Sequence, residues 1–246
     1  LVYLQLKPLR LYRLNPEHPP LIKDLAAIPL LFLNLNFPKD SPNWIQKENP
    51  QWWVQFDFGR DFIFRSGNNP SQIIFWSKFS LLFILIILGF ILFKLAKDIG
   101  GNLIGLGALF LYSFSPTLLA HGRLVTTDVG AAFGSVLAIY FWLNFLKKPK
   151  AINLIIAGII FGISLLFKFS LALLLPFFIL LTIIKTPKYL FSLFIAFLIG
   201  LIFVILPIYS LHMLEHPLEK QVSDAKFYLA PNPLGPLKDI VIWMSD

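Results

Sequence analysis

The chain has 246 residues, of which 57% are hydrophobic and only 14% are charged, and its mean hydropathy is +0.74. This composition excludes an ordinary soluble globular protein, and the absence of cysteine excludes disulfides and thiolate metal sites. The net charge of +8 is divided between lysines that flank apolar runs and a polar remainder of mixed charge, so nucleic acid is not an expected partner.

A polar cluster, NPEHPPLIK, occupies residues 15–23 near the start of the chain. After it, residues 20–36 are predicted to form a helix at the membrane interface, because prolines precede it and apolar residues recur at helical spacing. The residues of this stripe are Leu21, Leu25, Ile28 and Phe32. A short membrane span interrupted by Pro29 is the alternative, and it would invert the orientation of the chain.

Residues 38–74 are predicted to be a polar outer loop rich in proline, asparagine and aromatic residues. Aromatic side chains at this density beside a membrane usually lie at the level of the lipid headgroups. We therefore expect them to be membrane anchors rather than a binding site. The residues concerned are Trp44, Trp52, Trp53, Phe56, Phe58, Phe62 and Phe64.

Six charge-free runs follow, and we interpret each as a transmembrane helix because a bilayer core needs about 17–25 residues. The runs are 79–93, 99–120, 129–146, 151–167, 169–184 and 189–211. The fold class expected is therefore an all-α integral membrane protein. Its predicted parts are an outer juxtamembrane segment (1–74), a six-helix membrane region (75–211) and an outer segment (212–246).

Three short connections, 94–98, 147–150 and 185–188, hold seven lysines against the single acid Asp98. Cytoplasmic loops carry such an excess of positive charge, so these connections are predicted to be cytoplasmic. Both tails, the 121–128 segment and Lys168 then face the periplasm, the exterior or a lumen. The expected location is the plasma membrane, with several spans.

The hairpin HGRLVTTD, residues 121–128, places Arg123 and Asp128 between two apolar runs. Ionisable groups beside a bilayer usually mark a functional site, and the guanidinium fork of an arginine matches phosphate oxygens. A salt bridge between the two residues that merely closes the turn is the alternative interpretation.

Other polar residues have two interpretations each. Lys168 is either a site residue or a lysine that reaches the interface, and Lys23 and His18 either bind a ligand or form the polar face of a helix. Glu17 is either a base or a partner of a helix dipole. We expect no metal site at His212 and His216, because no third ligand accompanies them.

Four segments resemble consecutive blocks of the dolichyl-phosphate-mannose–protein mannosyltransferase family and its bacterial relatives of the GT-C superfamily. They are NPEHPPLIKDLAAIPLL, FGRDFIFRSGN, SPTLLAHGRLVTTDVGAAFGSVLAIYFW and AGIIFGISLLFKFS, in family order over residues 5–170. The resemblance implies a GT-C type helical bundle that moves a sugar, a mannose-like hexose, from a polyprenyl-phosphate carrier to a hydroxyl on the outer side. Inverting transfer is implied, with a carboxylate taking the acceptor proton.

The resemblance also implies roles for single residues. His18 and Lys23 match the family's juxtamembrane motif, Arg123 matches an arginine that contacts the donor phosphate, and Asp128 matches the hairpin acid. Lys168 matches a lysine common at that helix end. We expect Lys23, Lys168 and Arg123 to line one outer cavity, where they bind the donor phosphate together with His18.

The chain departs from the family pattern in two places. The Asp-Glu pair expected upstream of the H-P-P segment does not occur in residues 1–20, so the sequence looks like a fragment without its catalytic base. Glu17 is the first substitute within it, and Lys78 stands where an arginine is expected.

The predicted function is a polyprenyl-phosphate-dependent glycosyltransferase whose acceptor is a protein, a lipid or a glycan. No cofactor is expected with certainty, and the question of a divalent metal stays open. A transporter or flippase for an anionic lipid-linked substrate is the rival hypothesis. Transporters tend to have repeated halves with sites at mid-membrane, whereas the charges here lie at helix ends.

Overall fold

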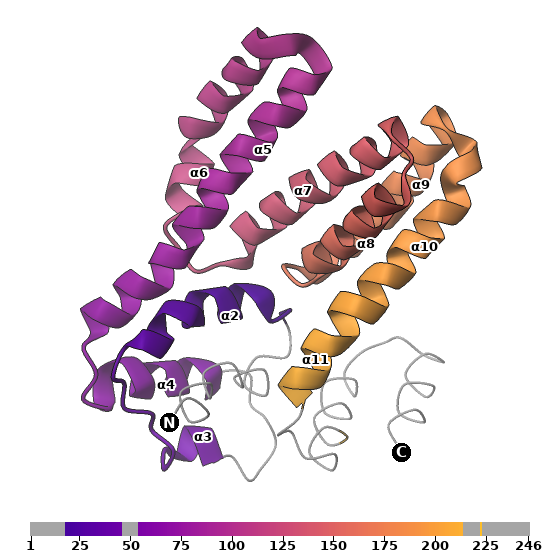
Figure 1. The fold of residues 1–246 in the computed structure, drawn as a ribbon. Coiled ribbons are helices and arrows are strands. Elements are labelled where there is room, and N and C mark those ends of the chain that lie inside the picture. The colour runs from indigo at the N-terminus through magenta and orange to yellow at the C-terminus, as the bar shows by residue number, and fades with distance from the viewer. Residues whose placement is uncertain (1–17, 46–53, 214–221, 223–246) are drawn as a thin grey trace, which may run out of the picture. The chain divides into compact units, whose positions relative to one another are not determined.

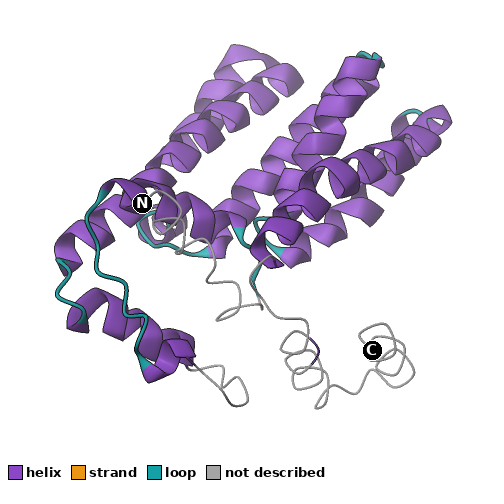
Figure 2. Ribbon diagram, turned by 60° about the horizontal axis from the view of Figure 1, so that its bottom comes forward, coloured by secondary structure: helices purple, strands orange, loops and turns teal. Residues whose placement is uncertain are grey.

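The computed structural model describes residues 18–45, 54–213 and 222, and its regular elements are all helices (Figure 2). The all-helical fold class predicted from the sequence is confirmed. The described residues divide into two compact units. We call residues 34–45, 54–73 and 210–213 the loop unit, and residues 18–33 and 74–209 the helical unit.

The helical unit is built mainly from long apolar helices. Its elements, some of which extend into the loop unit, are α2 (Leu21–Ala27), α5 (Pro70–Ser113), α6 (Pro116–His121), α7 (Thr127–Lys147), α8 (Ala151–Leu165), α9 (Leu174–Lys185), α10 (Leu190–Gly200) and α11 (Leu206–Met213). Short 3₁₀ turns precede α9 and α10, and a π-helical turn, Leu201–Ile205, joins α10 to α11.

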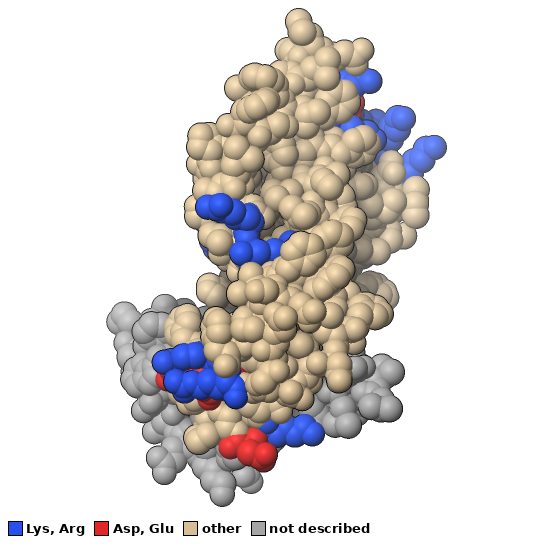
Figure 3. Space-filling model, turned by 90° about the vertical axis from the view of Figure 1, so that its left-hand side faces the viewer, with Lys and Arg blue, Asp and Glu red and all other residues tan. Residues whose placement is uncertain are grey.

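Three helical segments are long and apolar enough to cross a membrane: Pro70–Ser113, Thr127–Lys147 and Pro187–Met213. Two shorter apolar helices, Ala151–Leu165 and Phe169–Lys185, lie between the last two. Uncharged residues cover most of the described surface seen in Figure 3, where Lys and Arg side chains gather in a few groups. The chain is therefore a membrane protein by the length and composition of its helices, while the number of six spans stays a prediction.

The first apolar helix, α5, is a hairpin of two arms (Figure 1). Its 44 residues are interrupted at Gly100 and Gly101, and Gly101 has a φ of +84°, which a residue without Cβ adopts readily. The turn predicted at 94–98 is instead helical, and the chain reverses at the glycines. The Tyr112 hydroxyl of the returning arm donates a hydrogen bond of 2.8 Å to the Leu85 carbonyl of the outgoing arm.

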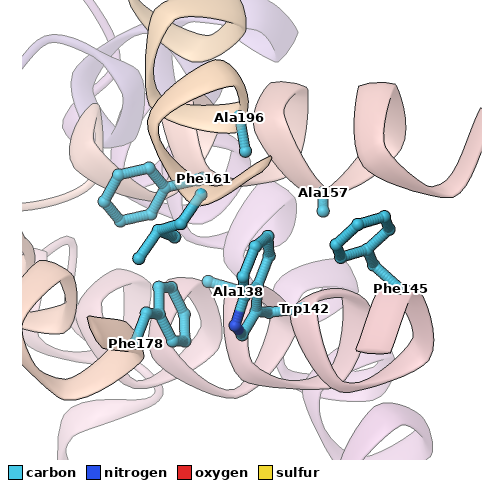
Figure 4. Packing of buried hydrophobic residues seen from close by; sticks show 8 residues of the cluster. Ala138, Trp142, Phe145, Ala157, Phe161, Phe178 and Ala196 are labelled. Carbon is cyan, nitrogen blue, oxygen red and sulfur yellow. The ribbon is translucent and has the colours of Figure 1, made fainter. Parts of the chain in front are cut away.

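The main core lies between α7, α8, α9 and α10 (Figure 4). Its buried residues are Ala138, Trp142, Phe145, Ala157, Phe161, Phe178, Leu193 and Ala196. One hydrogen bond crosses this core: Trp142 Nε1 donates to Thr182 Oγ1 at 3.0 Å, and the Thr182 hydroxyl donates to the Phe178 carbonyl at 2.6 Å. Both polar groups of the pair are thereby satisfied away from water.

Small residues bring α8 and α10 into backbone contact. A Cβ atom added to Gly158 would lie 2.6 Å from the Ala196 carbonyl oxygen, and one added to Gly162 would lie 2.7 Å from that of Gly200. Glycines four residues apart allow helices in membranes to approach closely and to pack along their backbones. This contact explains why α8 and α10 lie side by side in Figure 1.

The three lysine-rich connections meet at one end of the helical unit. Lys147 Nζ lies 3.3 Å from Asp98 Oδ2, which links the end of α7 to the α5 hairpin. The rings of Phe145 and Tyr189 are 5.4 Å apart and link the same end of α7 to the start of α10. That this end faces the cytoplasm stays a prediction.

The loop unit contains more helix than its sequence predicts: α3 (Pro42–Ile45), α4 (Val54–Arg60) and a π-helical turn, Asp61–Arg65. Several of its aromatics form a small core of their own rather than a set of membrane anchors. Phe58 is 3% exposed, and the rings of Phe37 and Trp44 pack against it and against each other with centroids 4.8–5.5 Å apart. The Phe62 ring packs against Phe37 at 6.1 Å. Phe56 and Phe64 are exposed, whereas Trp52 and Trp53 lie outside the described residues.

The side-chain contacts of Asp61 connect the segments that form this small core. Its carboxylate accepts hydrogen bonds from Asn43 Nδ2 at 2.9 Å and from Ser41 Oγ at 2.8 Å, and it pairs with Arg65 at 3.2 Å. The hydrogen bonds from Asn43 and Ser41 hold the pKa of Asp61 below its usual value. The polar segment predicted as a loop is thus folded through its own side chains.

Candidate functional site

The helix α2 docks on the ends of α7 and α8 inside the helical unit. Pro19 and Pro20 are fully buried, and the Leu21 N–H donates a hydrogen bond of 3.2 Å to the Leu166 carbonyl. Ile22 is 2% exposed and packs with Val129 and Phe167. The contact depends on Gly130, where an added Cβ would lie 2.7 Å from both Ile22 and Phe167.

The predicted boundaries and apolar face of this segment need correction. The α-helix has 7 residues and continues as a 3₁₀ turn of 5 residues that ends at Phe32 rather than at residue 36. It is too short for the membrane span considered as the alternative. Its buried residues are Ile22, Ala26, Ala27 and Leu30, whereas Ile28 and Phe32 of the predicted stripe are 46% and 85% exposed.

The centre of the candidate site is an ion pair between Lys168 and Asp128. Their Nζ and Oδ1 atoms are 2.8 Å apart, and the side chains are 35% and 55% exposed. Asp128 lies in the first turn of α7, where the helix dipole favours a negative charge. Lys168 directly follows the buried Phe167 and lies between α8, which ends at Leu165, and the 3₁₀ turn Phe169–Leu173, for which it is the extended N-cap residue.

Two histidines lie close enough to Asp128 to interact with its charge. They are His121, the last residue of α6, and His18, which precedes the buried prolines. The sequence singled out His18 but not His121, although His121 is the first residue of the hairpin motif. The structure therefore brings residues 18, 121, 128 and 168 into one electrostatic neighbourhood.

Lys23 lies in α2, and its amine contacts the backbone of the segment just before this helix. Its Nζ donates a hydrogen bond of 2.9 Å to the His18 carbonyl. Burial lowers the pKa of Lys23 from 10.5 to about 8, an effect that the nearby charge of Asp24 opposes. This lysine therefore changes its charge close to neutral pH, which an exposed lysine does not.

Arg123 takes no part in this ion pair. It lines a cavity of about 360 Å³ between the arms of α5 and α6, with Leu82, Leu85, Tyr112, Ser113, Leu118, Leu119 and Gly122. Neither Lys23 nor Lys168 lines this cavity, in contrast to the shared cavity expected from the sequence. Among the described residues Asp128 pairs with Lys168 rather than with Arg123, so the turn-closing salt bridge considered above is absent there.

A larger groove of about 750 Å³ lies between α2, α5 and α7, and we call it the α2 groove. Its walls are almost entirely apolar, and Phe167 in its lining is the residue before Lys168. The lining residues are Leu25, Ile28, Pro29, Phe32, Leu33, Trp76, Phe79, Ser80, Phe83, Ile84, Ile87, Phe133 and Phe167. Sequence reasoning missed this groove, because three separate segments form it.

Glu17 and His216 lie outside the described residues, and His212 belongs to the last turn of α11. Within the described part of the chain, no group of three or more His, Asp or Glu side chains is arranged to hold a metal ion.

Comparison with known families gives one match. The family described as dolichyl-phosphate-mannose-protein mannosyltransferase matches residues 67–212, a stretch that begins before α5 and ends in α11. It includes Arg123, Asp128 and Lys168. No curated protein and no solved structure matches the chain.

Proposed function

The chain belongs to the dolichyl-phosphate-mannose–protein mannosyltransferase family, and we propose from this that it transfers a mannose-like hexose from a polyprenyl-phosphate carrier to a hydroxyl group. Family membership implies a dolichyl-phosphate-mannose donor and a protein acceptor. We assign the acceptor hydroxyl to a serine or threonine side chain and the reaction to the outer side of the membrane, away from the lysine-rich end.

The observation that carries this proposal is the position of Lys168 next to the α2 groove. An apolar groove of about 750 Å³ is within the size range of ligand sites in proteins, and Phe167 is one of its lining residues. A polyprenyl chain needs an apolar surface, and its phosphate needs a cation where that surface ends. Phe167 and Lys168 supply the two in consecutive positions.

In the proposed reaction the acceptor oxygen forms a bond to the anomeric carbon of the sugar. The bond from that carbon to the phosphate oxygen breaks, and its electron pair leaves with the lipid phosphate. Fixed cations stabilise the charge that develops on this leaving group. We assign that task to Lys168, with Lys23 of α2 and His18 from the segment before it, and we retain Arg123 through the family resemblance.

A carboxylate takes the proton of the acceptor hydroxyl, and attack opposite the departing phosphate inverts the anomeric centre. Asp128 is the described carboxylate beside Lys168, and we propose it as a catalytic group. Glu17 and the acidic pair that the resemblance places upstream of His18 are the competing candidates for the base.

A transfer assay tests the proposal. The full chain in lipid vesicles is supplied with a polyprenyl-phosphate [³H]mannose and a peptide rich in serine and threonine, and the label on the peptide is counted. We expect transfer that is lost in Lys168→Met and retained in Lys185→Met, a lysine at the opposite end of the same helical segment. No label on the peptide from the unchanged chain, or equal labelling by both variants, would contradict the proposal.

A further inference from the structure

Lys168 is already bound to a carboxylate at the place where the proposed reaction needs it on a phosphate. We propose that Lys168 exchanges partners in the reaction: it leaves Asp128 and binds the phosphate of the donor lipid, and Asp128 is thereby released for the acceptor. This inference rests on the function proposed above. It adds that Asp128 competes with the donor for the same amine.

The geometry favours such an exchange over a permanent pair. The two side chains are 35% and 55% exposed, and exposed ion pairs are weak because water screens them. A lysine has a flexible four-carbon stem and an ammonium group without directional demands, so its amine can move between neighbouring anions. A phosphate offers more oxygen atoms and more charge than one carboxylate.

Asp128 keeps stabilising partners when the amine leaves. It lies in the first turn of α7, a helix of 21 residues, so the partial positive charge of the helix N-terminus remains beside it. His121 and His18 lie within electrostatic range. The exchange therefore does not leave an uncompensated carboxylate.

The exchange would also set the order of two steps, donor binding and proton transfer from the acceptor. A carboxylate that has lost its cation takes up a proton more readily, so Asp128 becomes a better proton acceptor once the donor phosphate holds Lys168. The acceptor oxygen then bonds to the anomeric carbon, the bond from that carbon to the phosphate oxygen breaks, and the acceptor proton goes to the Asp128 carboxylate. Donor binding would thus precede the activation of the acceptor.

A purely positioning role for Asp128 predicts the opposite effect on binding. If Asp128 served to hold Lys168 in place for the phosphate, its removal would weaken donor binding. If the two anions compete, its removal strengthens donor binding. The sign of the change therefore separates the two roles.

The experiment measures the affinity of the full chain in nanodiscs for a sugar-free polyprenyl phosphate. We expect Asp128→Asn to bind about two- to fivefold more tightly than the unchanged chain, because the amine no longer has to leave a carboxylate. Sugar transfer by this variant falls nevertheless. Asp98→Asn is the matched control: it removes the partner of Lys147 at the other end of α7, and both binding and transfer stay unchanged.

A double variant separates partner exchange from the simple loss of a negative charge near an anion. In Lys168→Gln the extra substitution Asp128→Asn should leave binding unchanged, because no amine remains to be released. Equal tightening with and without Lys168, or weaker binding in Asp128→Asn, would overturn the exchange. If the unchanged chain binds no polyprenyl phosphate, the proposed function itself fails, and thermal unfolding of each variant checks that it is folded.

Discussion

At the scale of single residues, two ion pairs of the described helical unit mark the two ends of α7. Lys168–Asp128 lies at its N-terminal end and Lys147–Asp98 at its C-terminal end. Both are partly exposed, so neither contributes much to stability. Their value for experiments is that one pair lies in the proposed site and the other does not.

Arg123 is the residue whose proposed role rests most on resemblance, and Arg123→Lys tests it. We expect this variant to lose most of the transfer activity, because an ammonium group cannot reproduce the two parallel hydrogen bonds of a guanidinium to a phosphate. The measurement is the rate of mannose transfer to a peptide. Arg65→Lys, an exposed arginine of the loop unit, is the control and should keep its activity. A rate within twofold of the unchanged chain in Arg123→Lys would exclude a phosphate contact.

Lys23 predicts a pH dependence of donor binding. Its pKa is lowered to about 8, so the amine is charged below pH 8 and loses its charge as the pH rises through this value. If Lys23 binds the donor phosphate, the affinity for polyprenyl phosphate should fall between about pH 7 and pH 9. Arginine stays charged in this range, so Lys23→Arg should remove the fall.

The control for this titration is Lys185→Arg at the far end of α9, which should show the pH profile of the unchanged chain. The role of Lys23 would be ruled out if its replacement by arginine left the same fall in affinity.

At the scale of elements, the helical unit is held by contacts that differ in kind. The α8–α10 contact depends on glycines that bring backbones together, whereas the α7–α9 contact depends on the hydrogen bond from Trp142 to Thr182. The contact of α2 with α7 and α8 combines a close approach and a hydrogen bond. Gly130 of α7 makes room for Ile22, and the Leu21 N–H donates to the Leu166 carbonyl at the end of α8. A side chain larger than that of glycine at position 130 would therefore clash with Ile22 of α2.

Two alanine substitutions of helical glycines should differ in their effect on the free energy of unfolding. Gly162→Ala places a methyl group 2.7 Å from the Gly200 carbonyl oxygen, and overpacking of this kind destabilises by about 1–3 kcal/mol. At Gly107 an added Cβ meets no atom within 4 Å, so Gly107→Ala should be neutral or stabilise by about 0.5–1 kcal/mol through helix propensity. Thermal unfolding in detergent measures both, and equal midpoints would contradict the close α8–α10 packing.

At the scale of the whole molecule, the distribution of charge predicts an orientation. The lysine-rich end of the helical unit should face the cytoplasm, and the end with Lys168 and Asp128 should face outward. The natural absence of cysteine makes this measurable, since a single introduced thiol is the only one in the chain.

We expect Leu124→Cys, at an exposed position of the 121–128 hairpin, to react with an impermeant maleimide on intact cells. Lys148→Cys, exposed between α7 and α8, should react only after the membrane is opened. The reverse pattern would place the proposed site in the cytoplasm and contradict an outward-facing reaction.

The sequence by itself determined the class of this protein and the positions of its apolar helices. The charge-free runs correspond to helical segments because hydropathy is a local property, and the motifs from His18 to Lys168 were sufficient to identify the family. The turn of the first hairpin differs from the prediction: the lysine-rich segment 94–98 is helical, and the chain reverses at Gly100 and Gly101, where Gly101 adopts a positive φ. The core role of Phe58 was also missed, since an aromatic residue suits a membrane interface and a small core equally well.

The tertiary structure alone decided which charged groups meet. Asp128 has Lys168 as its partner, 40 positions away, rather than Arg123, which is five positions away and lines the cavity between α5 and α6. The α2 groove likewise needs α2, α5 and α7 together. Spacing along the chain describes neighbours on one helix or turn, whereas these contacts depend on how the ends of separate helices pack. For that reason the sequence named most of the residues of the site but could not pair them.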